Sequence, residues 1–162
     1  MTVEDYLEKV RQLIAGYGHY VQYVGPDEEG HVGYCYTKGL SFARAEKFPE
    51  LVMAGFDPRL MQQLLNDAAE RMKEGDLRLR GPCFYGKLIQ DMDAAFAPVN
   101  ISTSSSLISL DEDTEVYFVF LPDANGLFPW DDGCDPAYKT QASGFDIAVT
   151  PRRDRLTAPR LH

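Results

Sequence analysis

Apolar residues recur at helical spacing in two segments of the chain. In the first, residues 3–14, they fall three or four positions apart behind a Thr2 with capping-box spacing to an acid, and glycines follow. In the second, Asp57 and Pro58 are the types that begin a helix, and an apolar stripe runs over residues 60–72 before Gly75. The pattern predicts two main helices.

Short runs of apolar residues predict strands elsewhere. Residues 19–24 and 32–37 are rich in Tyr and Val, and the polar turn 25–30 between them indicates a β-hairpin. Residues 51–54 form a short apolar run. Residues 115–121 are apolar at almost every position, which is typical of a central strand covered on both faces.

The remaining segments have weaker patterns. Residues 77–84 read as a strand interrupted by a Gly-Pro pair, residues 87–96 as a short helix or an irregular segment, and residues 102–106 as a polar linker. The sequence therefore predicts one α+β domain over residues 1–150, with a mixed, largely antiparallel sheet and two main helices packed on it. Residues 151–162 form an Arg- and Pro-rich tail, which we expect to be flexible.

The charge balance narrows the class of partner. The 162 residues contain 16 Lys and Arg against 25 Asp and Glu, a formal charge of -9. Such a surface repels phosphate backbones, so we expect no generic DNA or RNA binding. No apolar run approaches a membrane span, and the three cysteines (Cys35, Cys83 and Cys134) form no C-x-x-C pair. We therefore expect a cytoplasmic protein without membrane association, and an oligomer is compatible with the sequence.

Several short blocks stand in a specific order along the chain. They are Tyr36-Thr37-Lys38-Gly39-Leu40, Phe48-Pro49-Glu50-Leu51-Val52, Gly55-Phe56, Leu121-Pro122-Asp123, Gly126-Leu127-Phe128-Pro129-Trp130 and a trailing Gln141. In this order the chain resembles a family of bacterial and phage proteins catalogued as domain of unknown function 4262. The resemblance implies a shared fold and a shared pocket, and it implies no activity. The stretch 83–109 matches none of the blocks.

The two blocks at residues 36–40 and 48–52 each contain a candidate site. Tyr36, Thr37, Lys38 and Gly39 stand where a predicted strand ends, a place where ligands often bind, and the lysine can meet a phosphate or carboxylate. The alternative is a turn glycine beside a solvated lysine. Glu50 can act as a half-buried acid or base, or it can pair with Arg44 or Lys47 or accept backbone amides.

The late blocks place many oxygens and one indole in a turn region. The side chains that supply oxygens there are Asp123, Asp131, Asp132, Asp135 and Asn125. Clustered oxygens suggest Ca²⁺ or Mg²⁺, but the spacing is not that of an EF-hand, and tight turns use the same residues, so we assign no metal and no cofactor. Trp130 either packs over the core edge or stacks on a planar ligand. Gln141 is grouped with these ligand-binding candidates.

Three functions remain open from the sequence. The first is a non-catalytic module that binds a small polar or nucleotide-like ligand, for example to sequester a host signalling molecule in a phage setting. The second is a small, possibly metal-assisted hydrolase or transferase that uses Glu50 and Asp123 as acid and base, and it requires the two carboxylates to converge. The third is a domain whose acidic surface binds a basic partner protein. The ligand-binding hypothesis also predicts that residues 36–40 and 123–130 meet around one cavity.

Overall fold

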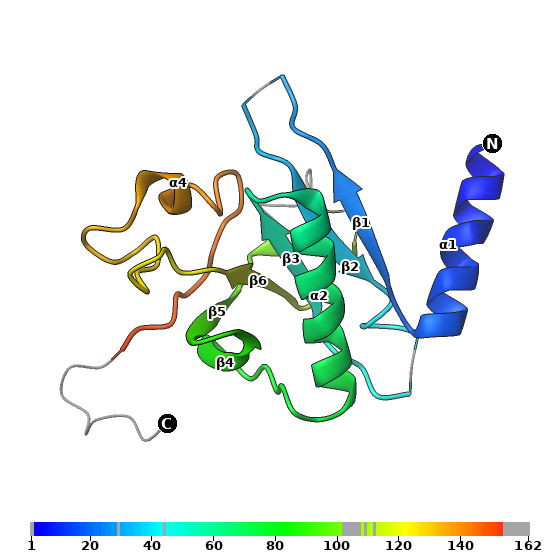
Figure 1. The fold of residues 1–162 in the computed structure, drawn as a ribbon. Helices are drawn as coiled ribbons and strands as arrows, with labels where there is room; N and C mark the ends of the chain where they lie inside the picture. The colour runs from blue at the N-terminus through cyan, green and yellow to red at the C-terminus, as the bar shows by residue number, and fades with distance from the viewer. Residues whose placement is uncertain are drawn as a thin grey trace.

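The computed structural model describes residues 2–28, 30–43, 45–101, 108, 110–111 and 113–153. Its elements in chain order are α1 (Val3–Tyr17), β1 (Tyr20–Val24), β2 (Tyr34–Lys38), β3 (Glu50–Ala54), α2 (Pro58–Lys73), β4 (Cys83–Ile89), β5 (Met92–Pro98), β6 (Val116–Phe120) and the short α4 (Pro136–Lys139). The strands form one sheet in the order β1-β2-β3-β6-β5-β4 (Figure 1). All pairings are antiparallel except that of β3 with β6, so the predicted α+β fold with a mixed, largely antiparallel sheet is confirmed.

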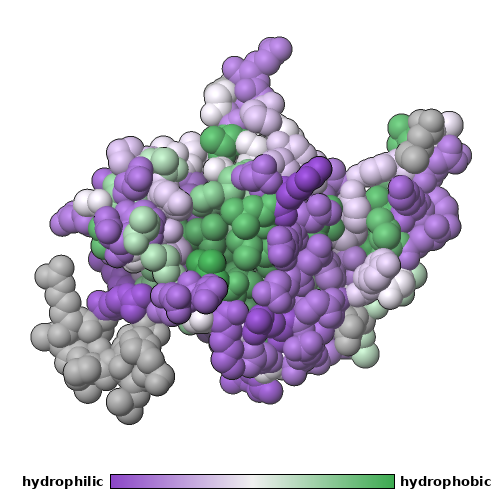
Figure 2. Space-filling view, in the orientation of Figure 1, coloured by the Kyte–Doolittle hydropathy of each residue, from purple (hydrophilic) through white to green (hydrophobic). Residues whose placement is uncertain are grey.

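Helix α2 covers one face of the sheet. Its N-cap, Asp57, accepts hydrogen bonds from the backbone N–H groups of Arg59 and Leu60, as the sequence predicted. The buried stripe of α2 is Met61, Leu64, Leu65, Ala68, Ala69 and Met72. This stripe packs on side chains of the sheet such as Met53 and Val119, while hydrophilic residues follow the outer face of the helix (Figure 2). The helix thus closes the first core.

The opposite face of the sheet is covered by the segment that follows β6. Phe118 and Phe120 point into a second core, where Phe128, Trp130 and Phe145 of this segment pack against them. All five residues of β6 are buried. The strand is therefore central and covered on both faces, as its uninterrupted apolar run predicted.

The first helix has the predicted caps but a shallow packing. The Thr2–Asp5 capping box is present and Gly18 ends the helix in a left-handed conformation, yet no residue of α1 is buried. Its last turn is fastened to the body of the protein by Lys73, whose Nζ donates hydrogen bonds to the Tyr17 carbonyl (2.6 Å) and to His19 Nδ1 (2.7 Å). Burial lowers the pKa of His19. No helix of the described residues is long and apolar enough to cross a membrane.

The expectation of a helix or irregular segment over residues 87–96 is wrong. Strands β4 and β5 form an antiparallel hairpin there, and Asp91 at its turn has a positive φ of 63°. The sequence hides this strand for two reasons. Residues 94–97 of β5 are all buried, so apolar and polar residues do not alternate along it, and alanine has a low strand propensity. The interrupted strand expected over residues 77–84 is regular only from Cys83. The linker at 102–106 and the tail beyond Arg153 lie outside the described residues.

Candidate functional site

The candidate residues divide between the two ends of the sheet. Tyr36 of β2 pairs with Val52 of the antiparallel β3, so the chain after Tyr36 runs towards Glu50 at the start of β3. Glu50 is level with Val116, at the start of the parallel β6, whereas Asp123 lies beyond the end of β6. At about 3.3 Å per strand residue the two carboxylates are roughly 20 Å apart. Glu50 and Asp123 therefore cannot serve one substrate as acid and base. Lys38 lines one cleft and residues 124–126 line another, so the prediction that residues 36–40 and 123–130 meet around one cavity is wrong.

Glu50 is the centre of a buried hydrogen-bond network at one end. Its carboxylate accepts five hydrogen bonds: from Thr37 Oγ1 (2.8 Å), Gly39 N (3.1 Å), Leu40 N (3.2 Å), Ser41 N (3.1 Å) and Ser41 Oγ (2.7 Å). We call this set the Glu50 network. Burial raises the pKa of Glu50, and the hydrogen bonds from Ser41 and Thr37 oppose that shift. Because donors fill the carboxylate, it holds the loop after β2. The alternative pairing with Lys47 is not formed, and Arg44, the other candidate partner, lies outside the described residues.

Thr37 and Gly39 have structural roles in the same network. The Thr37 hydroxyl donates to Glu50 and accepts from Leu51 N (2.8 Å), so it joins β2 to β3. Gly39 has a φ of 113°, and a Cβ there would lie 3.0 Å from His19 Cα. Only glycine allows this close approach. Tyr36 is buried in the second core.

Lys38 points to a different environment, a cleft of about 1080 Å³ beside the Glu50 network. The cleft, here the Lys38 cleft, is lined by Lys38, Ser41, Phe42, Lys47, Phe48, Pro49, Leu110, Asp111, Asp113, Thr114 and Glu115. It holds two lysines and three carboxylates, and none of these five groups makes an ion pair within the described residues. Phe42 is 61% exposed and offers a ring face.

Asp123 organises the turn region at the other end. Its Oδ1 accepts from the backbone N–H groups of Asn125 and Leu127 and its Oδ2 from that of Asp135, each at 2.9 Å. We call these contacts the Asp123 network. The N–H groups of Asp135 and Leu127 lower the pKa of Asp123. Asp131 similarly accepts from Phe128 N (2.9 Å), and no group of three potential ligands in the described residues can hold a metal ion.

Gln141 and Trp130 complete this turn region by packing. The Gln141 amide accepts from Leu121 N (2.9 Å) and donates to Leu121 O (2.7 Å), so it extends the hydrogen bonding of the chain beyond β6 as a neighbouring strand would. The Trp130 indole stacks on Phe128 at 5.1 Å and meets Phe120 edge-on at 5.0 Å. Trp130 was expected either to pack over the core edge or to stack on a ligand, and these contacts are those of packing at the core edge.

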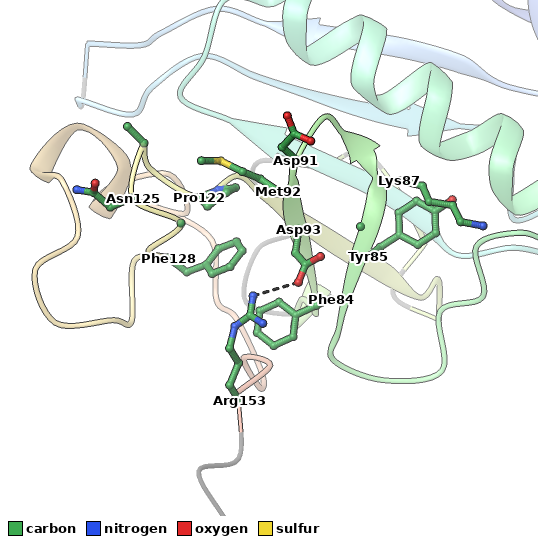
Figure 3. A pocket seen from close by; sticks show the side chains of 13 residues that line it. Phe84, Tyr85, Lys87, Asp91, Met92, Asp93, Pro122, Asn125, Phe128 and Arg153 are labelled. Carbon is green, nitrogen blue, oxygen red and sulfur yellow. Dashed lines mark hydrogen bonds and ion pairs between the residues drawn. The ribbon is translucent and has the colours of Figure 1, made fainter. Parts of the chain in front are cut away.

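A second cleft, of about 860 Å³, lies between the β4–β5 hairpin and the turn after β6 (Figure 3). Its lining includes Phe84, Gly86, Asp91, Asp93, Asn125, Phe128 and Arg153, and we call it the Phe84 cleft. Within it Arg153 pairs with Asp93 (3.0 Å) and lies over the Phe84 ring (4.5 Å). The sequence patterns did not indicate that Phe84, Asp93 and Arg153 belong to one site, because the hairpin that brings Phe84 beside Asp93 was not predicted.

The family model of a domain of unknown function (DUF4262) matches residues 13–135, most of the chain. The chain belongs to the DUF4262 family. Searches of curated proteins and of solved structures returned no match. The region that matches the DUF4262 model contains the whole sheet and both networks, whereas Arg153 lies outside it.

Proposed function

We propose that this protein is a non-catalytic binding module that holds a small polar, nucleotide-like ligand in the Lys38 cleft. The observation that carries the proposal is the set of five charged side chains that line the cleft without pairing with one another. Opposite charges that face one cleft and remain unpaired can each meet a group of the same ligand. A ligand with one anionic group and several hydrogen-bond donors can bind the lysines through its anion and the carboxylates through its donors.

The two lysines suit the anionic group of the ligand. Lys38 extends from the end of β2, where its Nζ lies 5.7 Å from the centre of the Tyr36 ring, and Lys47 lies on the loop before β3. The Glu50 network fixes the backbone on which Lys38 and Ser41 stand, so this wall of the cleft is preorganised. A single phosphate or carboxylate is the anion that two lysines can neutralise.

The acidic and aromatic lining residues suit donor groups of a planar ring. Asp111, Asp113 and Glu115 supply carboxylate oxygens, and the exposed ring of Phe42 offers a stacking surface. The lining carries three negative charges against two positive ones, and the protein carries -9. A nucleoside monophosphate is therefore favoured over a polyphosphate, whose extra charges the cleft does not match.

Thermal shift assays with nucleoside monophosphates, the matching nucleosides, nucleoside triphosphates and amino acids test the proposal. A bound ligand at a hundredfold excess over its Kd stabilises by about 2.7 kcal/mol, so we expect Tm to rise by roughly 5–10 °C with a monophosphate. The double variant Lys38→Met, Lys47→Met should abolish the shift. Lys9→Met, on the exposed face of α1, is the matched control and should keep it. No shift with any compound, or an equal shift in the double variant, would contradict the proposal.

A further inference from the structure

Arg153 makes the two contacts by which proteins recognise a guanidinium group. Its Nη2 lies 3.0 Å from Asp93 Oδ2, and its Cζ lies 4.5 Å from the centre of the Phe84 ring (Figure 3). A carboxylate beside an aromatic face is selective for arginine, because a planar, delocalised cation can stack and donate at once. An ammonium group is a compact, strongly hydrated charge that can pair with the carboxylate and lie over the ring, but it cannot stack on the ring as a plane while it donates.

The carboxylate of this site is held in place by the sheet. The Asp93 side chain is 17% exposed, and a Cβ at Gly86 would lie 2.9 Å from its Oδ1. The Asp93 carboxylate therefore occupies space that any side chain at position 86 would fill. Phe84 in turn packs on Phe128 at 5.5 Å. Since both partners of the guanidinium belong to the packed hairpin, the site does not depend on Arg153 to exist.

The Phe84 cleft extends beyond the space that Arg153 fills. Its other wall is the turn after β6, which includes Asn125 and which the Asp123 network holds (Figure 3). Asp91 stands exposed at the hairpin turn and makes no hydrogen bond or ion pair within the described residues. The cleft thus offers a second carboxylate and free volume beside a site already fitted to arginine.

We propose that the Phe84 cleft binds an arginine-bearing peptide of a partner protein, and that Arg153 occupies the site when the partner is absent. Arg153 is 48% exposed on its side chain, so it leaves the site without opening the core. The net charge of -9 attracts a basic partner over long range. The peptide arginine takes the place of Arg153 between Phe84 and Asp93, and a flanking basic or donor group meets Asp91.

Intrinsic fluorescence gives a direct measurement, because Trp130 is the only tryptophan and stacks on Phe128 at the floor of the cleft. The full-length Arg153→Ala variant removes the Arg153 guanidinium from its contacts with Phe84 and Asp93. We expect an end-blocked Gly-Arg-Gly peptide to bind this variant at least tenfold more tightly than the wild-type protein. The Gly-Lys-Gly peptide should bind the variant several-fold more weakly than the arginine peptide. Arg152→Ala, at the neighbouring exposed arginine, is the matched control and should bind like the wild type.

Two further variants separate recognition from a change of fold. Asp93→Asn combined with Arg153→Ala should lose the binding that Arg153→Ala gains, whereas Arg153→Lys should give an intermediate affinity because lysine occupies the site less well. Circular dichroism checks that each variant is folded. Equal affinity of the wild type and Arg153→Ala for the arginine peptide, no binding to either, or equal binding of the arginine and lysine peptides would overturn the proposal.

Discussion

Glu50 and Asp123 are the two carboxylates among the buried residues of the described chain, and they secure opposite ends of the same pair of parallel strands. Both accept several hydrogen bonds, most of them from loop residues. Glu50, which is fully buried, has its pKa raised, whereas Asp123, which is 3% exposed, has its pKa lowered. Five donors do not compensate Glu50 for the loss of water, while the backbone donors prevail over burial at Asp123.

The comparison shows that the number of donors alone does not set the sign of a carboxylate's pKa shift, because burial is the largest cause at Glu50 and backbone N–H groups are the largest cause at Asp123. The two networks also hold their loops in different ways. The Glu50 network lies inside the sheet end and binds the loop after β2 to two strands, whereas the Asp123 network closes a turn on itself through residues 125, 127 and 135. We therefore expect damage at Glu50 to affect the whole domain, and damage at Asp123 to remain more local.

The largest expected effect comes from Glu50→Ala. The change leaves the donors of Thr37 and Ser41 and the backbone N–H groups of Gly39 and Leu40 without their acceptor in a buried place. Because each buried unsatisfied group is costly, we expect the free energy of unfolding to fall by roughly 3–5 kcal/mol. Urea denaturation measures the loss. Glu115→Gln, at a nearby exposed glutamate, is the control and should change stability by less than about 0.5 kcal/mol.

Alanine substitutions at two glycines, one beside each network, compare how tightly the two ends of the sheet are packed. At Gly39, with a φ of 113°, a Cβ would lie 3.0 Å from His19 Cα and 3.1 Å from Gly18 O. At Gly126, with a φ of 80°, a Cβ would meet nothing within 4 Å. We expect Gly39→Ala to cost roughly 2–4 kcal/mol, since strain and overpacking add, and Gly126→Ala only about 1–2 kcal/mol. If the two variants lost equal amounts of Tm, the close contacts at Gly39 would not be the reason that a glycine is needed at this position.

Much of this arrangement follows from the sequence, and the rest depends on strand register. The caps at Thr2 and Asp57 and the fully buried β6 were predictable because they are local patterns. Glu50 was identified as a residue of interest, and accepting backbone amides was one of its three readings. Choosing between them needed the position of its donors, which lie nine to thirteen residues earlier in the chain and reach it only through the β2–β3 pairing. Likewise, the parallel pairing of β3 with β6 separates the two motif groups, and no local pattern reports a register.

Asp123→Asn is expected to have a smaller effect than either change at the Glu50 end. The amide keeps an oxygen for the N–H groups of Asn125 and Leu127, but its NH₂ faces the N–H of Asp135 and loses that bond. We expect Tm to fall by a few degrees without a change in the urea m-value. Because Asp123 holds a wall of the Phe84 cleft, the variant should also bind the arginine peptide more weakly in the Arg153→Ala background. A fall in Tm as large as that of Glu50→Ala would contradict the local character of the Asp123 network.

The subtlest prediction concerns pH, because the two carboxylates should have opposite effects. The folded pKa of Glu50 lies above its ordinary value of 4.5, so its stabilising contribution is fully present below that pH and is lost as pH rises through the folded pKa. The folded pKa of Asp123 lies below its ordinary value of 3.8, so its contribution is present above that pH and is lost as pH falls through the folded pKa. Urea midpoints across a pH series measure both. The difference between wild type and Glu50→Gln should shrink as pH rises above 4.5, and the difference between wild type and Asp123→Asn should shrink as pH falls below 3.8. If both differences moved the same way with pH, burial at Glu50 and backbone donors at Asp123 would not shift the two pKa values in opposite directions.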